Sequence, residues 1–429
     1  MRMSDSPDAP ARLLTVEQAL DRVLRAIPVL EPEHLPLGEV LGHVLAEDIT
    51  ADLDMPPFDN TSMDGYAVRA ADTRGASPET PVPLRVLASV PAGQVPDCAV
   101  EPGTAIRIMT GAPLPSDADA VVQFELTDEL QTRRPAQPGG TVQVLATVQP
   151  GQNVRPRGED VRAGSIVLAT GTPVRPPEIG ILAMLGHTHV WVYRRPRVAI
   201  LSTGDELVEI HEQPGPGQIR DSNRHALAAQ VARYGGIPIQ LGIARDTVED
   251  LRAKLRGGAA ADLLVTSAGV SVGDLDIVKA VLQMEGELAF WQVRMRPGKP
   301  LAFGHLDGVP LLGLPGNPVS SLVSFEQFVR PAILKMQGHT RLGKPELWAT
   351  CLDAIDNRGG RRSYLRGIIE RDTQVPDMNC YIVRLAGPQG SNILTSLAKA
   401  NGLIIVPETQ EGVQPGDRVR VQMLDWPEV

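Results

Sequence analysis

Apolar and polar positions follow three different patterns along this 429-residue chain, and each pattern predicts a different kind of element. Near the start, the capping-box sequence TVEQ at 15–18 precedes apolar positions at helical spacing, which predicts a helix beginning at Thr15. The same spacing at 37–46 predicts a second helix. A third helix, rich in alanine and leucine, is expected at about 177–185.

Short apolar runs bounded by Gly and Pro clusters characterise the segment from about residue 80 to 148. Four strands are expected there, at 83–87, 104–109, 120–124 and 141–145. The region 51–149 is therefore predicted to be a mostly β domain, inserted into a discontinuous helical domain formed by 12–50 and 150–190.

From Pro196 onward, strands and helices alternate several times, which predicts a doubly wound parallel α/β domain over 191–338. After Pro345 the pattern returns to strands and turns, and a small closed β-barrel is expected over 339–429. The predicted fold class is therefore α/β multidomain.

The segment 261–281 has the pattern of a buried strand, a tight loop and a helix. Its loop contains Ser271 and Gly273, followed by Asp274 and Asp276. Glycines and hydroxyl groups let a backbone approach an oxyanion closely, and two aspartates could hold the divalent cation that accompanies it. The alternative is a simple turn in which Asp274 only caps the following helix.

Other polar sequences also follow predicted strands, so they should share one edge of the sheet. Carboxylates that could bind Mg²⁺ there are Asp205, Glu206, Asp246, Asp274 and Asp276. Groups that could bind phosphate are Arg296, Lys299 and the amides of Gly298, Gly316 and Asn317. This combination predicts a site for a phosphorylated ligand, and the absence of a G-x-x-x-x-G-K-[ST] sequence shows that it is not a P-loop.

A second polar stretch, MPPFDNTSMDGYAV at 55–68, carries Asp59 and Asp64 between large apolar side chains. Those apolar residues would anchor the loop and hold the two aspartates in place, although a solvated loop remains the alternative. The turn at Thr110 and the mixed-charge sequence from Arg155 to Asp160 are weaker candidates, since the latter could equally pair with itself on the surface.

Composition narrows the classes of function. The net charge of −10 argues against non-specific nucleic-acid binding. Three widely separated cysteines form neither a disulfide framework nor a metal motif. No stretch approaches the roughly 18 apolar residues of a membrane span, and no apolar leader is evident, so a cytoplasmic location is expected.

Seven sequences, taken in order, resemble the MoeA family of molybdopterin molybdenumtransferases, to which the E domain of gephyrin also belongs. They are MPPFDNTSMDGYAV, RIMTGAPLP, RPRGED, STGDEL, SAGVSVGD, RPGKP and LPGNPVS, and the resemblance covers about residues 12–425. It implies an L-shaped homodimer whose α/β domain is like that of the molybdopterin adenylyltransferases. The implied reaction inserts molybdate into adenylated molybdopterin, with Mg²⁺-dependent cleavage of the phosphoanhydride and release of AMP.

The resemblance, combined with the polar rim, assigns roles to individual residues. Catalytic residues are expected to be Asp64, Thr110, Glu206, Asp246 and Asp276. Expected Mg²⁺ ligands are Glu206, Asp274 and Asp276. Substrate-binding residues are expected to be Arg155, Asp160, Ser271, Gly273, Arg296, Lys299, Pro315, Gly316, Asn317, Pro318, Arg366 and Ser391. In the implied dimer, the β domain and barrel of one subunit face the α/β rim of the other.

This chain departs from the family pattern at three positions. Gln292 stands where relatives commonly have lysine, Ala268 where many have glycine, and Ile277 where tyrosine is common. Two other functions remain open, a molybdopterin adenylyltransferase and a gephyrin-like scaffold. Expected partners are the adenylyltransferase that supplies the substrate and proteins that mature molybdoenzymes.

Overall fold

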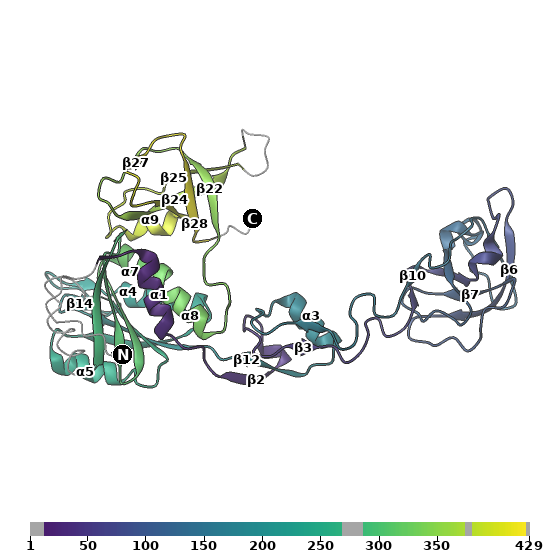
Figure 1. Cartoon of the computed structure of the whole chain (residues 1–429), viewed down its shortest axis with the longest axis horizontal. Coiled ribbons are helices and arrows are strands. Elements are labelled where there is room, and N and C mark those ends of the chain that lie inside the picture. Colours follow the sequence, from purple (N-terminus) through teal and green to yellow (C-terminus); the bar gives the residue numbers. More distant parts are fainter. Residues whose placement is uncertain (1–12, 268–285, 374–379, 426–429) are drawn as a thin grey trace. The chain divides into compact units, whose positions relative to one another are not determined.

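The computed structural model describes residues 13–267, 286–373 and 380–425, which divide into two compact units (Figure 1). Unit 1 comprises Met1–Glu47, Gly171–Pro176 and His189–Val429, and unit 2 comprises Asp48–Thr170 and Pro177–Thr188. Each unit is therefore discontinuous in sequence, and in unit 1 the first segment lies more than 120 residues from the others. The finer division into four domains stays a prediction.

A seven-stranded sheet forms the centre of unit 1. Its strands are β1 (Leu13–Leu14), β13 (Arg197–Thr203), β16 (Ile237–Ala244), β17 (Leu263–Ser267), β18 (Gly286–Val293), β20 (Pro300–Leu306) and β21 (Val309–Leu314). The order is β1-β18-β20-β21-β17-β13-β16. Pairing is parallel from β16 to β21, as predicted, whereas β20 is antiparallel to both of its neighbours. The sheet is therefore mixed rather than wholly parallel.

Helices cover both faces of this sheet, as expected for a doubly wound domain. They are α1 (Val16–Ala26), α4 (Asn223–Arg233), α5 (Val248–Arg256), α7 (Pro318–Ser324) and α8 (Arg330–Met336). Alternate residues of β13 reach opposite faces, because Val198 and Ile200 join the buried cluster of α1, α4, α7 and α8, while Ala199 and Leu201 join that of α5. A π-helical turn, Phe325–Val329, connects α7 to α8, so the three segments form one long helix after β21.

The start of α1 agrees with its sequence signature. The Thr15 hydroxyl accepts a hydrogen bond from the Gln18 amide, and the Gln18 side chain accepts one from the Thr15 amide. This reciprocal pair satisfies two amides that the first helical turn leaves unbonded. The capping-box prediction is therefore confirmed.

The helix predicted at 37–46 is wrong. Only a 3₁₀ turn forms, at Leu37–Glu39, and Gly42 then adopts a φ of +78° that ends any helical path. Val44 bridges to Pro173 and Leu45 bridges to Val192, so this backbone pairs with distant segments of unit 1. The strand that precedes this segment, β2 (Pro32–Pro36), forms an antiparallel ribbon with β12 (His189–Tyr193). Val40, Val44 and Leu45 are buried by tertiary pairing instead of helical packing, whereas Leu41 is 53% exposed.

The C-terminal part of unit 1 is a barrel, as predicted. Its strands are β22 (Glu346–Cys351), β24 (Arg362–Arg371), β25 (Tyr381–Leu385), β26 (Gly402–Val406) and β28 (Arg418–Met423). Pairing of β24 with β26 closes the ring, and the two-residue β19 (Met295–Arg296) adds to β24 from outside. Small elements complete it: β23 (Ile355–Asp356), β27 (Gly412–Val413) and α9 (Leu394–Lys399).

The barrel is fixed to the α/β part of unit 1. Tyr364, Leu403 and Ile405 belong to the same buried cluster as α1 and α8. Arg362 forms ion pairs with Glu17 of α1 and, at 3.1 Å, with Glu408. The barrel therefore has a defined position against the sheet and its helices.

Unit 2 contains a five-stranded sheet of order β8-β5-β7-β6-β9. These strands are β5 (Gly65–Val68), β6 (Val82–Val90), β7 (Thr104–Ile108), β8 (Ala120–Gln123) and β9 (Thr141–Val144). They confirm the four strands predicted between 80 and 148. Smaller elements are β3 (Ile49–Thr50) with β11 (Ile166–Leu168), β4 (Asn60–Thr61) with β10 (Val154–Arg155), the 3₁₀ turns Ala70–Thr73 and Phe124–Leu126, α2 (Glu129–Thr132) and α3 (Pro176–Met184).

Among the described residues, no helix combines the length and apolar composition that crossing a membrane requires.

Candidate functional site

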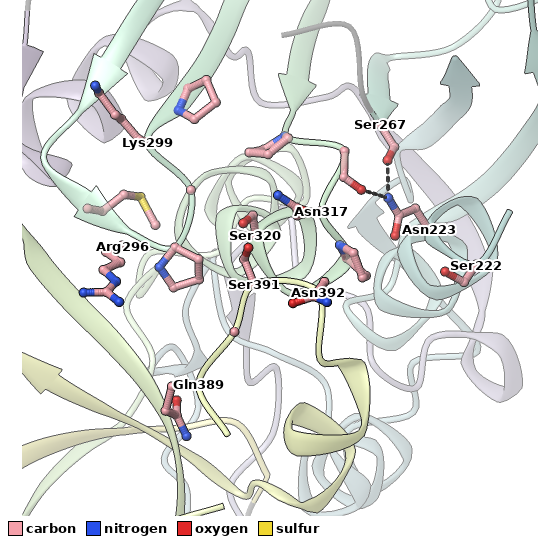
Figure 2. Close-up of a pocket in the computed structure, with 18 of the residues that line it drawn as sticks. Ser222, Asn223, Ser267, Arg296, Lys299, Asn317, Ser320, Gln389, Ser391 and Asn392 are labelled. Carbon is pink, nitrogen blue, oxygen red and sulfur yellow. Dashed lines mark hydrogen bonds between the residues drawn. The ribbon is translucent and has the colours of Figure 1, made fainter. Parts of the chain in front are cut away.

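A pocket of about 780 Å³ opens in unit 1 at the carboxyl ends of the central strands (Figure 2). Its walls come from five places: the loops after β13, β18 and β21, the approach to α4, and the barrel. The predicted site residues that line it are Glu206, Arg296, Lys299, Pro315, Gly316, Asn317, Pro318, Arg366 and Ser391. Residues that the sequence did not assign to a site also line it, including Asn223, Arg361 and Asn392.

The RPGKP loop reaches this edge because two strand reversals cancel. β18 is antiparallel to β20, and β20 is antiparallel to β21, so β18 ends at the same edge as β21 and β17. Gly298, with a φ of +100°, lies so close to Ser324 that an added Cβ would be 2.4 Å from its Oγ. Glycine is therefore required where this loop packs against α7.

Five cationic side chains line the pocket: Arg220, Arg296, Lys299, Arg361 and Arg366. Arg366 is fully buried, and its guanidinium donates to Ser396 Oγ (3.1 Å), Pro388 O (3.1 Å) and Gly390 O (2.9 Å). All three acceptors are neutral. Burial, reinforced by the charge of Arg296, lowers the pKa of Arg366 to about 10. The guanidinium therefore remains charged near neutral pH, and its charge is available to attract an anion.

The barrel loop that carries Ser391 contacts the α/β part of the same chain. The Ser391 carbonyl accepts a 3.0 Å hydrogen bond from the amide of Val319, at the beginning of α7. Barrel and rim of one chain line one pocket, and the implied position of a partner subunit stays a prediction. Two arginines of the segment 361–366 are held within the fold, because Arg366 is buried and Arg362 is ion-paired.

Glu206 is the predicted metal ligand that lines the pocket. Its carboxylate folds over Gly204, where an added Cβ would be 2.4 Å from Glu206 Oε2, and Gly204 has a φ of +142°. Nearby, the Asp246 amide donates to Asp205 Oδ1 at 3.3 Å, which links the loops after β13 and β16. Among the described residues, no three His, Cys, Asp or Glu side chains gather into a metal site.

Part of the prediction lies outside the described residues. Ser271, Gly273, Asp274 and Asp276 all fall within 268–285, as do the departures Ala268 and Ile277. The third departure, Gln292, pairs with Pro300 within the β18–β20 ribbon.

The loop after β21 is held by the side chain of Asn223, a residue that no sequence pattern assigned to the site. The two N–H groups of the Asn223 carboxamide donate to Ser267 Oγ (2.8 Å) and Gly316 O (2.7 Å), as Figure 2 shows. Figure 2 also places Asn223 and Ser267 on one side of the pocket and Arg296 and Lys299 on the other. The signal that could have identified Asn223 is its position at the start of α4, the helix that follows the central strand β13.

A second polar cluster lies in unit 2 and includes Asp64 and Thr110. Asp64 Oδ1 accepts from both the amide and the hydroxyl of Thr110, each at 2.7 Å. These two bonds, the amide bond first, hold the pKa of Asp64 below its ordinary value. The carboxylate is therefore ionised at neutral pH, and its geometry is set by the turn that carries Thr110.

Backbone pairing brings the remaining predicted residues of unit 2 to this cluster. Arg155 pairs with Asn60 through β10 and β4, and the Asp160 amide donates to Met55 O at 3.0 Å. The stretch 55–68 and the sequence 155–160 are therefore neighbours in space. Their roles in binding stay predictions.

Comparison with known proteins accounts for nearly the whole chain. Three family models match: the MoeA N-terminal region, domains I and II (residues 14–186), a probable molybdopterin binding domain (199–335) and the MoeA C-terminal region, domain IV (349–424). A molybdopterin molybdenumtransferase of Haemophilus influenzae is 36% identical over 415 residues, covering 96% of this chain and 98% of that protein. Molybdopterin molybdenumtransferase 2 of Mycobacterium tuberculosis is 39% identical over 399 residues, covering 91% and 94%.

A solved structure has the same architecture. The crystal structure of the molybdopterin biosynthesis MoeA protein from Pyrococcus horikoshii superposes with a TM-score of 0.81 at 32% identity, covering 96% of this chain and all of that one. Identity above 30% over almost the full length of both chains establishes the relationship. This chain belongs to the MoeA family of molybdopterin molybdenumtransferases.

Proposed function

We propose that this chain inserts molybdate into the dithiolene of adenylated molybdopterin, with cleavage of the phosphoanhydride and release of AMP. The observation that carries the proposal is the charge of the unit 1 pocket. Arg296, Lys299 and the buried Arg366 line one space together with the carboxylate of Glu206. Cations of this kind suit a doubly charged oxyanion and a phosphorylated pterin, in a protein whose net charge is −10.

Arg366 would act on the anion from a fixed position. Its three hydrogen bonds hold the loop 388–391, and its charge is not cancelled by a carboxylate in those contacts. A charge that is already ordered needs no reorganisation when the anion arrives. Arg296 and Lys299 lie on the RPGKP loop, across the pocket from Asn223 and Ser267, and would neutralise the phosphate groups of the ligand.

Mg²⁺ is part of the proposal, and the described residues are compatible with it. Mg²⁺ is typically held by one or two carboxylates together with substrate phosphates and water. Glu206 provides one carboxylate in the pocket, and Asp246 lies on the adjacent loop, linked to it through Asp205. When bound, Mg²⁺ would neutralise the phosphoanhydride as it breaks. The protein's part is to hold the Glu206 carboxylate over Gly204.

A homodimer and a cytoplasmic location complete the proposal. The apolar side chains of Phe58 and Met63, exposed by 42% and 43%, flank the Asp64 cluster of unit 2 and offer a surface for a second copy. The three cysteines are free thiols, which suits a reducing compartment.

The homodimer is tested by light scattering on the purified chain, which measures the oligomeric state.

The test measures AMP released from adenylated molybdopterin by the purified chain with Mg²⁺. We expect molybdate to stimulate release, and sulfate, an oxyanion of the same shape and charge, to do so far less. Formation of adenylated molybdopterin from ATP would instead support an adenylyltransferase. Binding without turnover would support a scaffold. The barrel residues in the pocket favour the transferase, since an adenylyltransferase of this type consists of the α/β domain alone.

A further inference from the structure

Asn223 lies in the pocket but has no direct role in the proposed reaction. It is the first residue of α4 and lines the unit 1 pocket. Both hydrogens of its Nδ2 group are engaged, one with Ser267 Oγ at 2.8 Å and one with Gly316 O at 2.7 Å. A carboxamide has only two N–H donors, so this group has no hydrogen left for a ligand.

The two acceptors belong to neighbouring parts of the sheet edge. Ser267 is the last residue of β17, and Gly316 lies in the loop that follows β21. The strands are adjacent and parallel, with Ser267 paired to Leu314. Asn223 therefore joins two strand ends from a third element, α4.

The loop after β21 needs an external donor. Pro315 and Pro318 have no N–H groups, so they donate no backbone hydrogen bonds that would fix the loop. The bond from Asn223 orients the peptide of Gly316, and with it Asn317, whose carbonyl accepts from the Ser321 amide in the first turn of α7. The orientation of the pocket wall thus depends on a side chain.

Asn223 is itself held rigidly. The buried carboxylate of Asp221 accepts from Ser202 Oγ at 3.0 Å and from the Arg224 amide at 3.1 Å. Arg224 also pairs with Asp221 at 3.2 Å. The start of α4 is therefore anchored to the end of β13, and little side-chain entropy remains to be lost when Asn223 bridges the two loops.

We propose that Asn223 is a positioning residue for the reaction in this pocket: it fixes the Gly316 carbonyl and the Ser267 hydroxyl, and through them the wall that the substrate contacts. Because Ser267 Oγ accepts from Asn223, the serine proton must point away from it. This inference rests on the proposed function for its catalytic part, whereas its structural part concerns the protein alone.

The decisive variant is Asn223→Asp, which keeps the shape of the side chain. It removes both donors and places a carboxylate 2.7 Å from the Gly316 carbonyl. Displacement of a positioned wall by about 1 Å is expected to lower kcat/KM for adenylated molybdopterin by on the order of 100-fold near neutral pH. Protonation of the introduced carboxyl group restores one donor, so the loss should shrink as the pH falls.

Two further variants separate the positioning role of Asn223 from the effect of an added charge and from misfolding. Asn223→Ala removes the donors without adding charge, so its loss of kcat/KM should be smaller and should not depend on pH. This variant also keeps the test valid if Asn223→Asp does not fold. Asn392→Asp adds the same charge to the same pocket, and no hydrogen bond from Asn392 to Gly316 or Ser267 is present among the described residues. An equal loss with the same pH profile in Asn392→Asp would show that charge alone is responsible and would overturn the proposal.

A readout that needs no substrate distinguishes this inference from the proposed function. Amide hydrogen exchange at Gly316 and Asn317 should be at least tenfold faster in Asn223→Asp, while exchange in β13 stays at the wild-type rate. Unchanged exchange at the two amides would overturn the inference even if the enzyme were active. Lack of molybdate-stimulated AMP release by the wild type would instead reject the proposed function and leave the exchange result to decide on Asn223.

Discussion

The two polar clusters of this chain hold their loops in different ways. In the unit 1 pocket, side chains reach backbone carbonyls: Asn223 holds Gly316, and Arg366 holds Pro388 and Gly390. In unit 2, backbone groups bond to one another across the loops that carry Asp64 and Thr110. The Gly111 amide donates to Thr61 O at 2.9 Å, and the Phe124 amide donates to Asp64 O at 3.1 Å.

The difference predicts how each cluster responds to substitution. A backbone-held loop keeps its path when one side chain changes, because its hydrogen bonds do not involve that side chain. A side-chain-held loop loses its support with a single substitution, because its carbonyls lose the side-chain donor that held them. The pocket of unit 1 should therefore be sensitive to single changes and the cluster of unit 2 tolerant of them.

The largest effect is expected from Gly204→Ala. The added methyl group would lie 2.4 Å from Glu206 Oε2, and a φ of +142° disfavours any residue with a Cβ. The Glu206 carboxylate would be displaced, so molybdate-stimulated AMP release should fall by on the order of 100-fold. Glu206→Gln should give a similar loss and a weaker dependence on Mg²⁺ concentration.

Gly217→Ala is the control for backbone strain. Gly217 has a φ of +77°, and an added Cβ would meet nothing within 4 Å. This variant should lose about 1 kcal/mol of stability and keep its activity. Equal activity losses in the two glycine variants would mean that strain, and not the displaced carboxylate, accounts for the effect.

An intermediate effect is expected from Arg366→Lys. The lysine keeps the charge, but one ammonium group cannot span Ser396 Oγ, Pro388 O and Gly390 O. The loop carrying Ser391 should shift, and the molybdate concentration for half-maximal AMP release should rise by about tenfold. Arg358→Lys, at a pair whose side chains are 75% and 65% exposed, is the matched control and should behave as wild type. An unaltered molybdate titration in Arg366→Lys would show that the loop does not depend on the guanidinium.

The smallest effect is expected from Asp64→Asn. Hydrogen bonds from Thr110 depress the pKa of Asp64 in the folded state, so its stabilising contribution is present above the unfolded pKa, near 3.8, and is lost as the pH falls through the folded value. Because the side chain is exposed, this contribution should be below about 1 kcal/mol. The free energies of unfolding of wild type and variant, measured by urea titration, should differ at neutral pH and converge in acid. A difference that persists unchanged in acid would contradict this assignment.

Local signals in the sequence predicted local structure well. The capping box at Thr15 predicted the start of α1, and short apolar runs bounded by Gly and Pro located the strands of both β regions. The ligand edge was predictable as well, because loops after parallel strands must share one edge. The structure brings Glu206, Arg296 and Gly316 together there, although their roles stay predictions.

Features that depend on distant segments were not predictable. The 37–46 segment has helical periodicity, but its backbone pairs with residues near 173 and 192. Burial of Arg366 depends on a barrel loop more than twenty positions later, at Pro388 and Gly390. The contacts of Asn223 depend on the position of α4 beside the ends of β17 and β21. No sequence pattern within α4 specifies that position.

The discontinuity of unit 1 has a consequence for the order of events during synthesis. β1 pairs with β18, where Leu14 lies beside Val293, and the Leu24 carbonyl of α1 accepts a bond from Lys335 Nζ at 2.6 Å. The ribosome must therefore add about 280 residues before the first strand meets its neighbour, which takes roughly 15–60 s. Unit 2 is fully translated in that interval, so the apolar face of α1 should be a preferred site for chaperone contact on the nascent chain.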